Sequence, residues 1–472
     1  MQDYQLPEIL RVGLEDLALQ VLILDLGEPH DFLARAMDPP SALAMRNSLK
    51  LLEELGAVEC DWQNSKPIFP TQSRDEGGSE SCGTLSVSSE LTALGFHLAM
   101  LPVEPRVGKM MIYGALLGCV EPALTIAASM SSKNPFISPF DSRDAANVAR
   151  QQFSTEDSDH LTILTAFNEW KDIRRKKGER SAQAFLRDNF LSSMTLFQME
   201  ELRKQYSKLL VDIGFLPGGF HLKGKGRGKT ESPAGGSNAN ASNLALVKAV
   251  LCAGLYPNII VAPRPLVDGS SKREAGEYAF QSRNKGEVYL HPCTISFTSK
   301  KLASRYCCFH EIVRTRKTYV RDTSCVSPFA LVLFGGALEV YHEEGVATVD
   351  GWLKFRSTAK PATLVKHLRA QMERMLLRKI IAPEDDVTES PEAKALIEAI
   401  STLLRHETQG ATASSELEER LCDAEIARQW LCCDNLNEQS SGGSGRGSGR
   451  GRKQDGRGGG RGRSSGSGSG QR

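Results

Sequence analysis

The N-terminal region places apolar residues at the spacing of short α-helices. Leu14, Leu17, Val21 and Leu24 recur every three or four positions, which predicts one helix that buries them. A second helix is predicted after Pro39-Pro40, capped by Ser41 and ended by Gly56, with an apolar face of Ala42, Met45, Leu49, Leu52 and Leu55. Ala57–Cys60 and Thr92–Gly95 are predicted to pair as a short β-hairpin.

Residues from Phe96 to Gly214 keep the helical period. One helix is predicted from Val107, Met111, Ala115 and Leu116. Another is predicted with Asp157 or Ser158 as its cap and with Leu161, Leu164, Phe167 and Trp170 on one face. The pattern continues through Ala184, Leu186, Leu191, Met199, Leu202, Tyr206, Leu209, Leu210 and Ile213. A helical bundle is therefore expected here.

The next segment changes from a short helix to a β-rich pattern. The helix is predicted at Leu244–Leu255. Short runs bounded by turn residues then predict strands at Ile259–Ala262, Glu287–Leu290, Ile295–Phe297, Tyr306–Arg314, Thr318–Asp322 and Leu331–Phe334, which suits a five-stranded barrel. Val349–Phe355 is predicted as a last strand, and Pro361 as the start of a helix with Leu364, Leu368, Met372, Met375 and Leu376 on one face.

Polar, low-complexity stretches interrupt these elements. Gln72–Glu90 is a Ser/Gly/acidic segment predicted to be disordered, and residues 217–243 are predicted to be a flexible basic loop. Residues 383–440 hold 14 acidic and 4 basic side chains and form a predicted acidic linker, in which Ala393–Leu404 and Glu416–Leu431 are expected as isolated helices. Residues 441–472 hold 8 basic and 1 acidic side chains in an RGG-like pattern that cannot bury a core and is predicted to be disordered.

Cysteine usage and hydropathy limit the compartment and the cofactors. None of the 11 cysteines forms a CxxC pair or a zinc-type cluster, so reduced, buried thiols and no bound metal are expected. The N-terminus lacks a basic segment followed by an apolar one, and no apolar run reaches membrane-spanning length. A cytoplasmic or nuclear protein without a membrane partner is predicted.

Three blocks of sequence point to a family. They are MDPPSALAMRNSLKLLEELGAVE (Met37–Glu59), LTALGFHLAMLPVEPRVGKMMIYGALLGC (Leu91–Cys119) and SPFALVLFGG (Ser327–Gly336). In this order and spacing they resemble the C-terminal cassette of the DEAH-box RNA helicases, with GFHLAMLPVEPRVGKM and VDGWLKFRSTAKPATLVKHLR closest to the group that includes G-quadruplex-unwinding members. The resemblance covers residues 7–381.

The resemblance implies a multidomain α+β protein. It implies a winged helix at 7–95 with a disordered wing insertion at 72–90, a ratchet-like helical bundle at 96–216, the basic loop at 217–243, and an OB-fold with a C-terminal helix at 244–382. The family couples ATP hydrolysis to 3′-to-5′ movement on RNA, and its cassette keeps RNA in a channel against two RecA lobes.

The sequence lacks the motifs that carry out ATP hydrolysis in that family. There is no GxxxxGK[ST] loop, Asp-Glu-Ala-His box or QRxGR motif. Lys223–Thr230 ends like a Walker A loop, but it has Lys223 where the first glycine belongs. Without a phosphate cradle, a metal carboxylate and an arginine, phosphoryl transfer has no stabilised transition state. We therefore expect no cofactor in this chain, since ATP and Mg²⁺ would be bound by the RecA lobes.

Candidate RNA contacts are expected in the predicted barrel and in the tail. Thr315-Arg316-Lys317 is predicted as a turn that clusters Arg314, Arg316, Lys317 and Arg321 with Tyr319, where cations meet phosphate and the ring stacks a base. Lys300, Lys301 and Arg305 are expected to widen the patch, and Arg446, Arg450 and Arg452 to bind RNA without fixed geometry. The alternatives are a solvated hairpin tip with Tyr319 in the barrel core, and a solubilising tail.

Two hypotheses about function remain open from the sequence. The first is the RNA-binding portion of a truncated DEAH-box helicase that guides single-stranded or structured RNA and has its RecA lobes as partners, but no ATPase motor of its own. The second is a stand-alone RNA-binding or adaptor protein derived from such a helicase.

Overall fold

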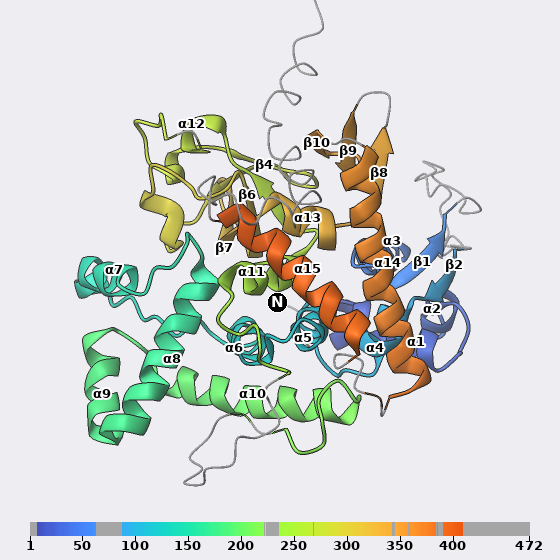
Figure 1. Cartoon of the computed structure of the whole chain (residues 1–472), viewed down its shortest axis with the longest axis horizontal. Coiled ribbons are helices and arrows are strands. Elements are labelled where there is room, and N and C mark those ends of the chain that lie inside the picture. Colours follow the sequence, from blue (N-terminus) through green and yellow to red (C-terminus); the bar gives the residue numbers. More distant parts are fainter. Residues whose placement is uncertain are drawn as a thin grey trace, which may run out of the picture. The chain divides into compact units, whose positions relative to one another are not determined.

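The N-terminal part of the computed structural model combines helices with one β-hairpin. The structure describes residues 7–62, 87–220, 222, 236–267, 269–341, 345–356, 359–383, 385 and 390–408. Its first elements are η1 (Glu8–Leu10), α1 (Glu15–Ile23), α2 (Pro29–Leu33), α3 (Ala42–Glu54), β1 (Val58–Asp61), β2 (Ser88–Leu91) and α4 (Ala93–Ala99) (Figure 1). Ser41 caps α3 by accepting a hydrogen bond from the Ala44 amide, and Gly56 ends it with a positive φ, as predicted.

Two predictions for this region are wrong in detail. Helix α1 buries Ala18, Leu19 and Val21 and leaves Leu17 and Leu24 exposed, so its contact face is rotated from the predicted one. The partner of β1 is β2, because Thr92 instead caps α4 through a hydrogen bond from the Gly95 amide. Three residues of the predicted wing insertion, Ser88–Glu90, are therefore strand; the side chain of Ser89 donates to Glu28 at 2.7 Å and fixes β2 in place. Residues 63–86 lie outside the described residues.

Helices then follow one another as the periodicity predicts. They are α5 (Pro105–Leu116), α6 (Val120–Met130), η2 (Phe140–Ser142), α7 (Arg143–Gln151), α8 (Asp159–Lys177), α9 (Glu179–Asp188), α10 (Ser193–Asp212) and α11 (Leu244–Leu255). The sequence predicted α11 to the residue, and Asn243 caps it. Of the predicted basic loop, Asn238 and Asn240 form hydrogen bonds to the backbone of Glu121 and Leu117, so this end is held in place.

A closed barrel follows, with strand order β3-β4-β5-β7-β6. The strands are β3 (Ile259–Val261), β4 (Phe280–Ser282), β5 (Gly286–Leu290), β6 (Tyr306–Arg314) and β7 (Thr318–Val326), joined by α12 (Arg264–Val267), η3 (Ala275–Glu277) and η4 (Ile295–Thr298). Its interior is a separate core that includes Ile260, Phe280, Val288, Phe309 and Val320. The predicted five-stranded barrel is confirmed, with β4 as a strand that the sequence did not indicate.

Three predicted strands take other forms. Ile295–Phe297 is part of the 3₁₀ helix η4, and Leu331–Phe334 lies in helix α13 (Pro328–Phe334). Ser327 accepts the Phe329 amide and Pro328 sits in the first turn, so the chain enters a helix there. Val349–Phe355 is not one strand: it contains the turn between β9 (Val346–Val349) and β10 (Leu353–Arg356), which form a sheet with β8 (Leu338–Tyr341).

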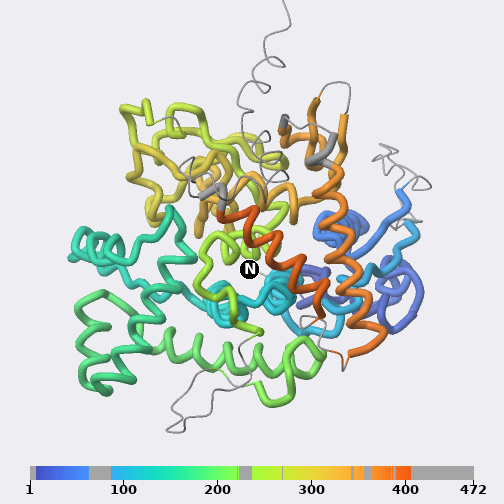
Figure 2. Tube along the Cα trace, viewed as in Figure 1, coloured from blue at the N-terminus to red at the C-terminus, as the bar shows by residue number. Residues whose placement is uncertain are grey.

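The two C-terminal helices pack against the rest of the protein, and α14 reaches its N-terminal region. Helix α14 (Ala359–Ile381) begins two residues before Pro361, lies against α4, and buries Leu368, Met372, Met375 and Leu376 as predicted. Helix α15 (Pro391–Thr408) lies against α11, α13 and α14, so the expectation of an isolated helix in an acidic linker is wrong for this segment. Figure 2 shows α14, in orange, beside the cyan and blue N-terminal segments that include α4. Within the described residues, no helix is long and apolar enough to cross a membrane.

Candidate nucleic-acid interface

The β6–β7 hairpin presents the predicted basic cluster to solvent. Strand β6 ends at Arg314 and β7 begins at Thr318, and the Thr315 amide donates to the Lys317 carbonyl at 3.0 Å, which closes the predicted turn. Arg314, Arg316 and Lys317 are exposed. The structure therefore brings these three cations together at one hairpin tip.

Tyr319 lies on the outer surface of the barrel. The next residue, Val320, is fully buried in the barrel core, and side chains alternate along a strand, so Tyr319 points away from that core. It is partly buried because parallel pairing of β5 with β7 sets it beside Tyr289, with ring centroids 6.4 Å apart. The alternative that Tyr319 fills the core is therefore excluded.

Two neighbours of Tyr319 were not anticipated from the sequence. The His291 ring meets Tyr319 edge-on at 6.1 Å, and the ammonium of Lys317 lies 3.9 Å from the centre of the Tyr289 ring. Arg321 Nη2 lies 3.1 Å from His291 Nε2, and since arginine can only donate, that nitrogen is the acceptor. We call Tyr289, His291, Lys317, Tyr319 and Arg321 the tyrosine–arginine patch.

The surroundings of His291 in this patch favour its neutral form. Burial, and then the positive charge of Arg321, lower the pKa of His291 from its ordinary value. Its other ring nitrogen, Nδ1, lies 2.8 Å from Cys293 Sγ and 3.2 Å from the Cys293 amide nitrogen. The patch thus combines cations fixed by Tyr289 and His291 with tyrosine rings, which are the groups that bind backbone phosphate and stack on unpaired bases.

Lys300, Lys301 and Arg305 do not join this patch. They precede β6, whose first residue Tyr306 pairs with Val326, at the end of the hairpin opposite to the turn. A strand of 9 residues separates the two ends, which corresponds to roughly 30 Å. Lys300 and Lys301 are exposed, so their individual role stays a prediction, but they do not widen the hairpin site. Lys223–Thr230, Arg446, Arg450 and Arg452 lie outside the described residues.

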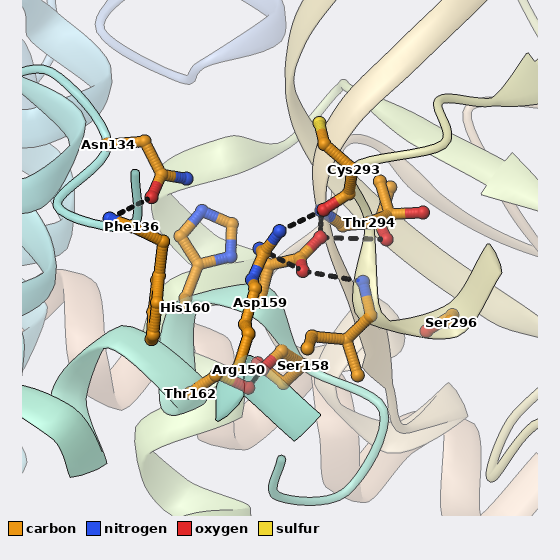
Figure 3. Close-up of polar contacts among 12 residues, drawn as sticks. Asn134, Phe136, Arg150, Ser158, Asp159, His160, Thr162, Cys293, Thr294 and Ser296 are labelled. Atoms are coloured by element: carbon orange, nitrogen blue, oxygen red, sulfur yellow. Dashed lines mark hydrogen bonds and ion pairs between the residues drawn. The ribbon is translucent and has the colours of Figure 1, made fainter. Parts of the chain in front are cut away.

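The barrel strand that carries the patch is tied to helix α8 through a buried carboxylate. Asp159, the first residue of α8, accepts hydrogen bonds from the amides of Ile295 and Thr323 and from Arg150 Nη2, each at 2.8 Å (Figure 3). Arg150 also donates to the Cys293 carbonyl. Burial raises the pKa of Asp159, while Arg150 and the two amides act in the opposite direction. One side chain therefore joins α7, α8 and β7.

The next residue extends this junction. His160 Nδ1 lies 2.8 Å from Ser324 Oγ, which in turn lies 2.6 Å from Ser158 Oγ. Ser158 is also the N-cap of α8, one of the two predicted caps, through a hydrogen bond from the Leu161 amide. Burial lowers the pKa of His160 to about 3, with His310 contributing in the same direction. His160 therefore packs in a buried junction between α8 and β7.

Comparison with known proteins assigns these parts to a family. Residues 104–163 match the ratchet-like helicase associated domain (HA2), residues 247–338 the oligonucleotide/oligosaccharide-binding (OB)-fold, and residues 345–406 the C-terminal domain in RNA helicases. The chain carries the C-terminal cassette of the DEAH-box RNA helicases. The last match runs past Ala382, where the resemblance was expected to end, and includes α15.

Curated relatives of this cassette are RNA helicases several times its length. It is 34% identical over 402 residues to the ATP-dependent RNA helicase DHX29 of Mus musculus, covering 85% of this chain and 26% of that protein. It is 34% identical to the DExH-box ATP-dependent RNA helicase DExH1 of Arabidopsis thaliana, covering 85% and 35%. It is 36% identical to the human ATP-dependent DNA/RNA helicase DHX36, covering 81% and 34%. The chain thus spans between a quarter and just over a third of these relatives.

Proposed function

We propose that this cassette binds single-stranded RNA and guides it for a DEAH-box helicase, while the ATPase motor lies outside its residues. The tyrosine–arginine patch carries the proposal. It places two tyrosine rings, a lysine and an arginine on the outer face of a barrel of the oligonucleotide-binding type. A flexible single strand offers unstacked bases to the rings and phosphates to the cations.

Other parts of the proposal follow from the same family. Helices α1 and α3 with the β1–β2 hairpin are proposed to be a winged helix that packs against RecA lobes, as the resemblance implies. ATP and Mg²⁺ are proposed to bind those lobes, since the sequence offers no complete phosphate loop. The whole protein's reaction, ATP-driven movement on RNA, would then use the cassette as its RNA guide.

The second candidate is a stand-alone RNA-binding or adaptor protein. The same patch supports it, because RNA binding at the barrel needs no motor. A transcript that begins near Met1, without RecA motifs in frame upstream, would favour this candidate over the first.

Substitutions at the hairpin test the proposal. Stacking contributes about 1–3 kcal/mol per base, so Tyr319→Ala should weaken binding of a single-stranded RNA by tenfold or more. Arg316→Ala/Lys317→Ala should weaken it as well and reduce its salt dependence. Because Tyr319 lies outside the barrel core, the melting temperature of the Tyr319→Ala variant should differ little from that of the wild type. Affinity is measured by fluorescence anisotropy in chains that end before residue 441.

Matched controls exist on the same protein. Tyr341→Ala removes an exposed tyrosine on β8, and Arg175→Ala/Lys176→Ala removes two exposed cations that are ion-paired with Asp172 at the end of α8. Both controls should retain wild-type affinity. If the hairpin variants bind as tightly as these controls while remaining folded, the patch is not the RNA contact.

A further inference from the structure

A basic pocket lies in the helical bundle. It has a volume of about 400 Å³ and is formed by α8, α10, Gly218, Phe220 and Leu222. Its lining carries the cationic side chains of Lys171, Arg203, Lys204 and Lys208, and Glu200 is the one carboxylate among the described lining residues. Val211, Phe220 and Leu222 line the pocket with apolar surface. A pocket of this size accommodates a small organic molecule or one nucleotide unit.

The nearby carboxylates already have partners. Glu200 accepts from Arg174 at 2.8 Å, and Glu201 from Lys204 at 2.6 Å. Glu121 accepts from Arg203, which is 1% exposed and stacks over Phe167. Among the residues that the structure describes, Lys171 and Lys208 are left without a hydrogen-bonded or ion-paired counter-charge. The pocket therefore carries positive charge that its own walls do not neutralise.

Lys171 is the more constrained of these two lysines. It is partly buried on α8, whereas Lys208 is exposed on α10. Burial lowers the pKa of Lys171, and Arg203 and, more weakly, Arg174 act in the same direction, while the carboxylates of Glu121 and Glu200 act in the opposite direction. The last turn of α8 differs, because Arg175 and Lys176 form exposed ion pairs with Asp172. Lys171 shares its carboxylate neighbours with Arg203 and Arg174, so an anion that enters the pocket would further stabilise its ammonium.

We propose that this pocket is a binding site for the phosphate group of a phosphate ester. Lys171 and Lys208 contact the phosphate oxygens, and Phe220 and Leu222 contact the organic part. The site uses none of the residues of the tyrosine–arginine patch. Its occupant is either a phosphate of bound RNA or a free phosphorylated small molecule, and both share this chemistry.

Protection of Lys171 from acylation reports occupancy of this site. The full chain is treated with acetic anhydride with and without inorganic pyrophosphate at constant ionic strength, and modification of each lysine is measured by mass spectrometry. Pyrophosphate should slow acetylation of Lys171 and leave Lys176 unaffected. If Lys171 is acetylated at the same rate with and without pyrophosphate, and also with and without single-stranded RNA, the proposal is overturned.

Binding measurements on variants give an independent readout. Lys171→Gln and Lys208→Gln should each weaken pyrophosphate binding by about tenfold, the loss expected for one charge-assisted hydrogen bond. Lys176→Gln, on the same helix but ion-paired outside the pocket, is the control and should bind as the wild type does. Unchanged affinity in both pocket variants, with wild-type melting temperatures, would contradict the assignment.

A single-stranded RNA distinguishes the two sources of phosphate. If RNA also protects Lys171 and competes with pyrophosphate, the pocket holds an RNA phosphate. If pyrophosphate alone protects it, the site belongs to a small phosphate ester. Hairpin variants such as Arg316→Ala/Lys317→Ala should leave pyrophosphate protection unchanged, so failure of the proposed RNA function and failure of this pocket are separate results.

Discussion

At the scale of single residues, Asp159 and His160 show how a buried polar pair can join two parts of a chain. Asp159 satisfies two backbone amides and one arginine, which offsets part of the cost of burying its charge. His160 stays neutral, and its Nε2 atom is buried without a hydrogen bond in the described structure. A proton on this imidazole would place a buried positive charge in the junction with no hydrogen-bond partner at Nε2.

The stability of the protein should therefore depend on pH through His160. Its pKa falls from an ordinary 6.5 when unfolded to about 3 when folded. The stabilisation from a neutral His160 is fully present above the unfolded pKa and is lost as pH falls toward the folded pKa, because only the unfolded chain takes up the proton readily. Between about pH 7.5 and about pH 5 the loss amounts to roughly 2 kcal/mol.

His160→Asn removes this titration while an amide atom can still reach Ser324. Urea unfolding at the two pH values should show a smaller loss of stability on acidification in His160→Asn than in the wild type. The raised pKa values of Asp159 and Asp322 make acidification favour the folded state, which is opposite to the effect of His160. Both carboxylates are present in the wild type and in His160→Asn, so their contribution cancels when the two proteins are compared. His367→Asn, which alters an exposed histidine on α14, should keep the wild-type pH dependence. Parallel curves for wild type and His160→Asn would show that His160 is protonated normally.

At the scale of elements, the sequence predicted correctly those helices and strands whose ends are set by neighbouring cap or turn residues. Helix α11 and strand β6 have their predicted bounds, because a cap or turn residue flanks each apolar run. Leu331–Phe334 was predicted as a strand since a short apolar run has no period that separates a buried strand from a buried helix. Ser327 and Pro328, which start α13, were the signal that could have decided it. Strand β4 is only three residues long and carries too little pattern.

In the candidate site too, contacts between neighbouring residues were predicted, whereas contacts made by pairing of distant strands were missed. The turn at Thr315–Lys317 and its cations follow from neighbouring residues and were predicted. Tyr289 and His291 were missed because they meet Tyr319 and Arg321 only through parallel pairing of β5 with β7, between segments about thirty residues apart in sequence. Lys300 and Arg305 were grouped with the hairpin by closeness in sequence, whereas a long strand carries them away from its tip.

Helix α15 offers a test of tertiary packing against local helix propensity. Ala393, Leu396, Ile400 and Leu404 recur at helical spacing and are buried, and Ser401 accepts from Asn243 at 3.0 Å. Ile400 is fully buried, so Ile400→Ala should lower the free energy of unfolding by about 2–5 kcal/mol.

The matched control for α15 is Glu398→Ala on its exposed side, which should change stability by less than about 0.5 kcal/mol. Chemical unfolding followed by circular dichroism measures both. A helix that stood apart from the rest of the protein would give equal, small effects for the two variants.

At the scale of the whole chain, charge is segregated although the formal net charge is only +1. The tail from residue 441 holds 8 basic side chains against 1 acidic, outside the described residues, while the patch and the basic pocket are built on ordered elements. Arginines spaced by glycine can bind phosphate without selecting a sequence. Bulk RNA affinity is therefore expected from the tail, and selectivity for single strands from the barrel.

Salt dependence separates these two contributions. Each phosphate neutralised on a single strand steepens the slope of log affinity against log salt by about 0.7, so deletion of Gly442–Arg472 should flatten that slope by several such steps. A tail with every arginine replaced by lysine keeps its charge and should keep the slope, while Tyr319→Ala in the full chain should lower affinity with the slope nearly unchanged. RNA binding is measured across a salt series for the four proteins. If the slope is unchanged after deletion of the tail, the electrostatic contact with RNA lies in residues before the tail.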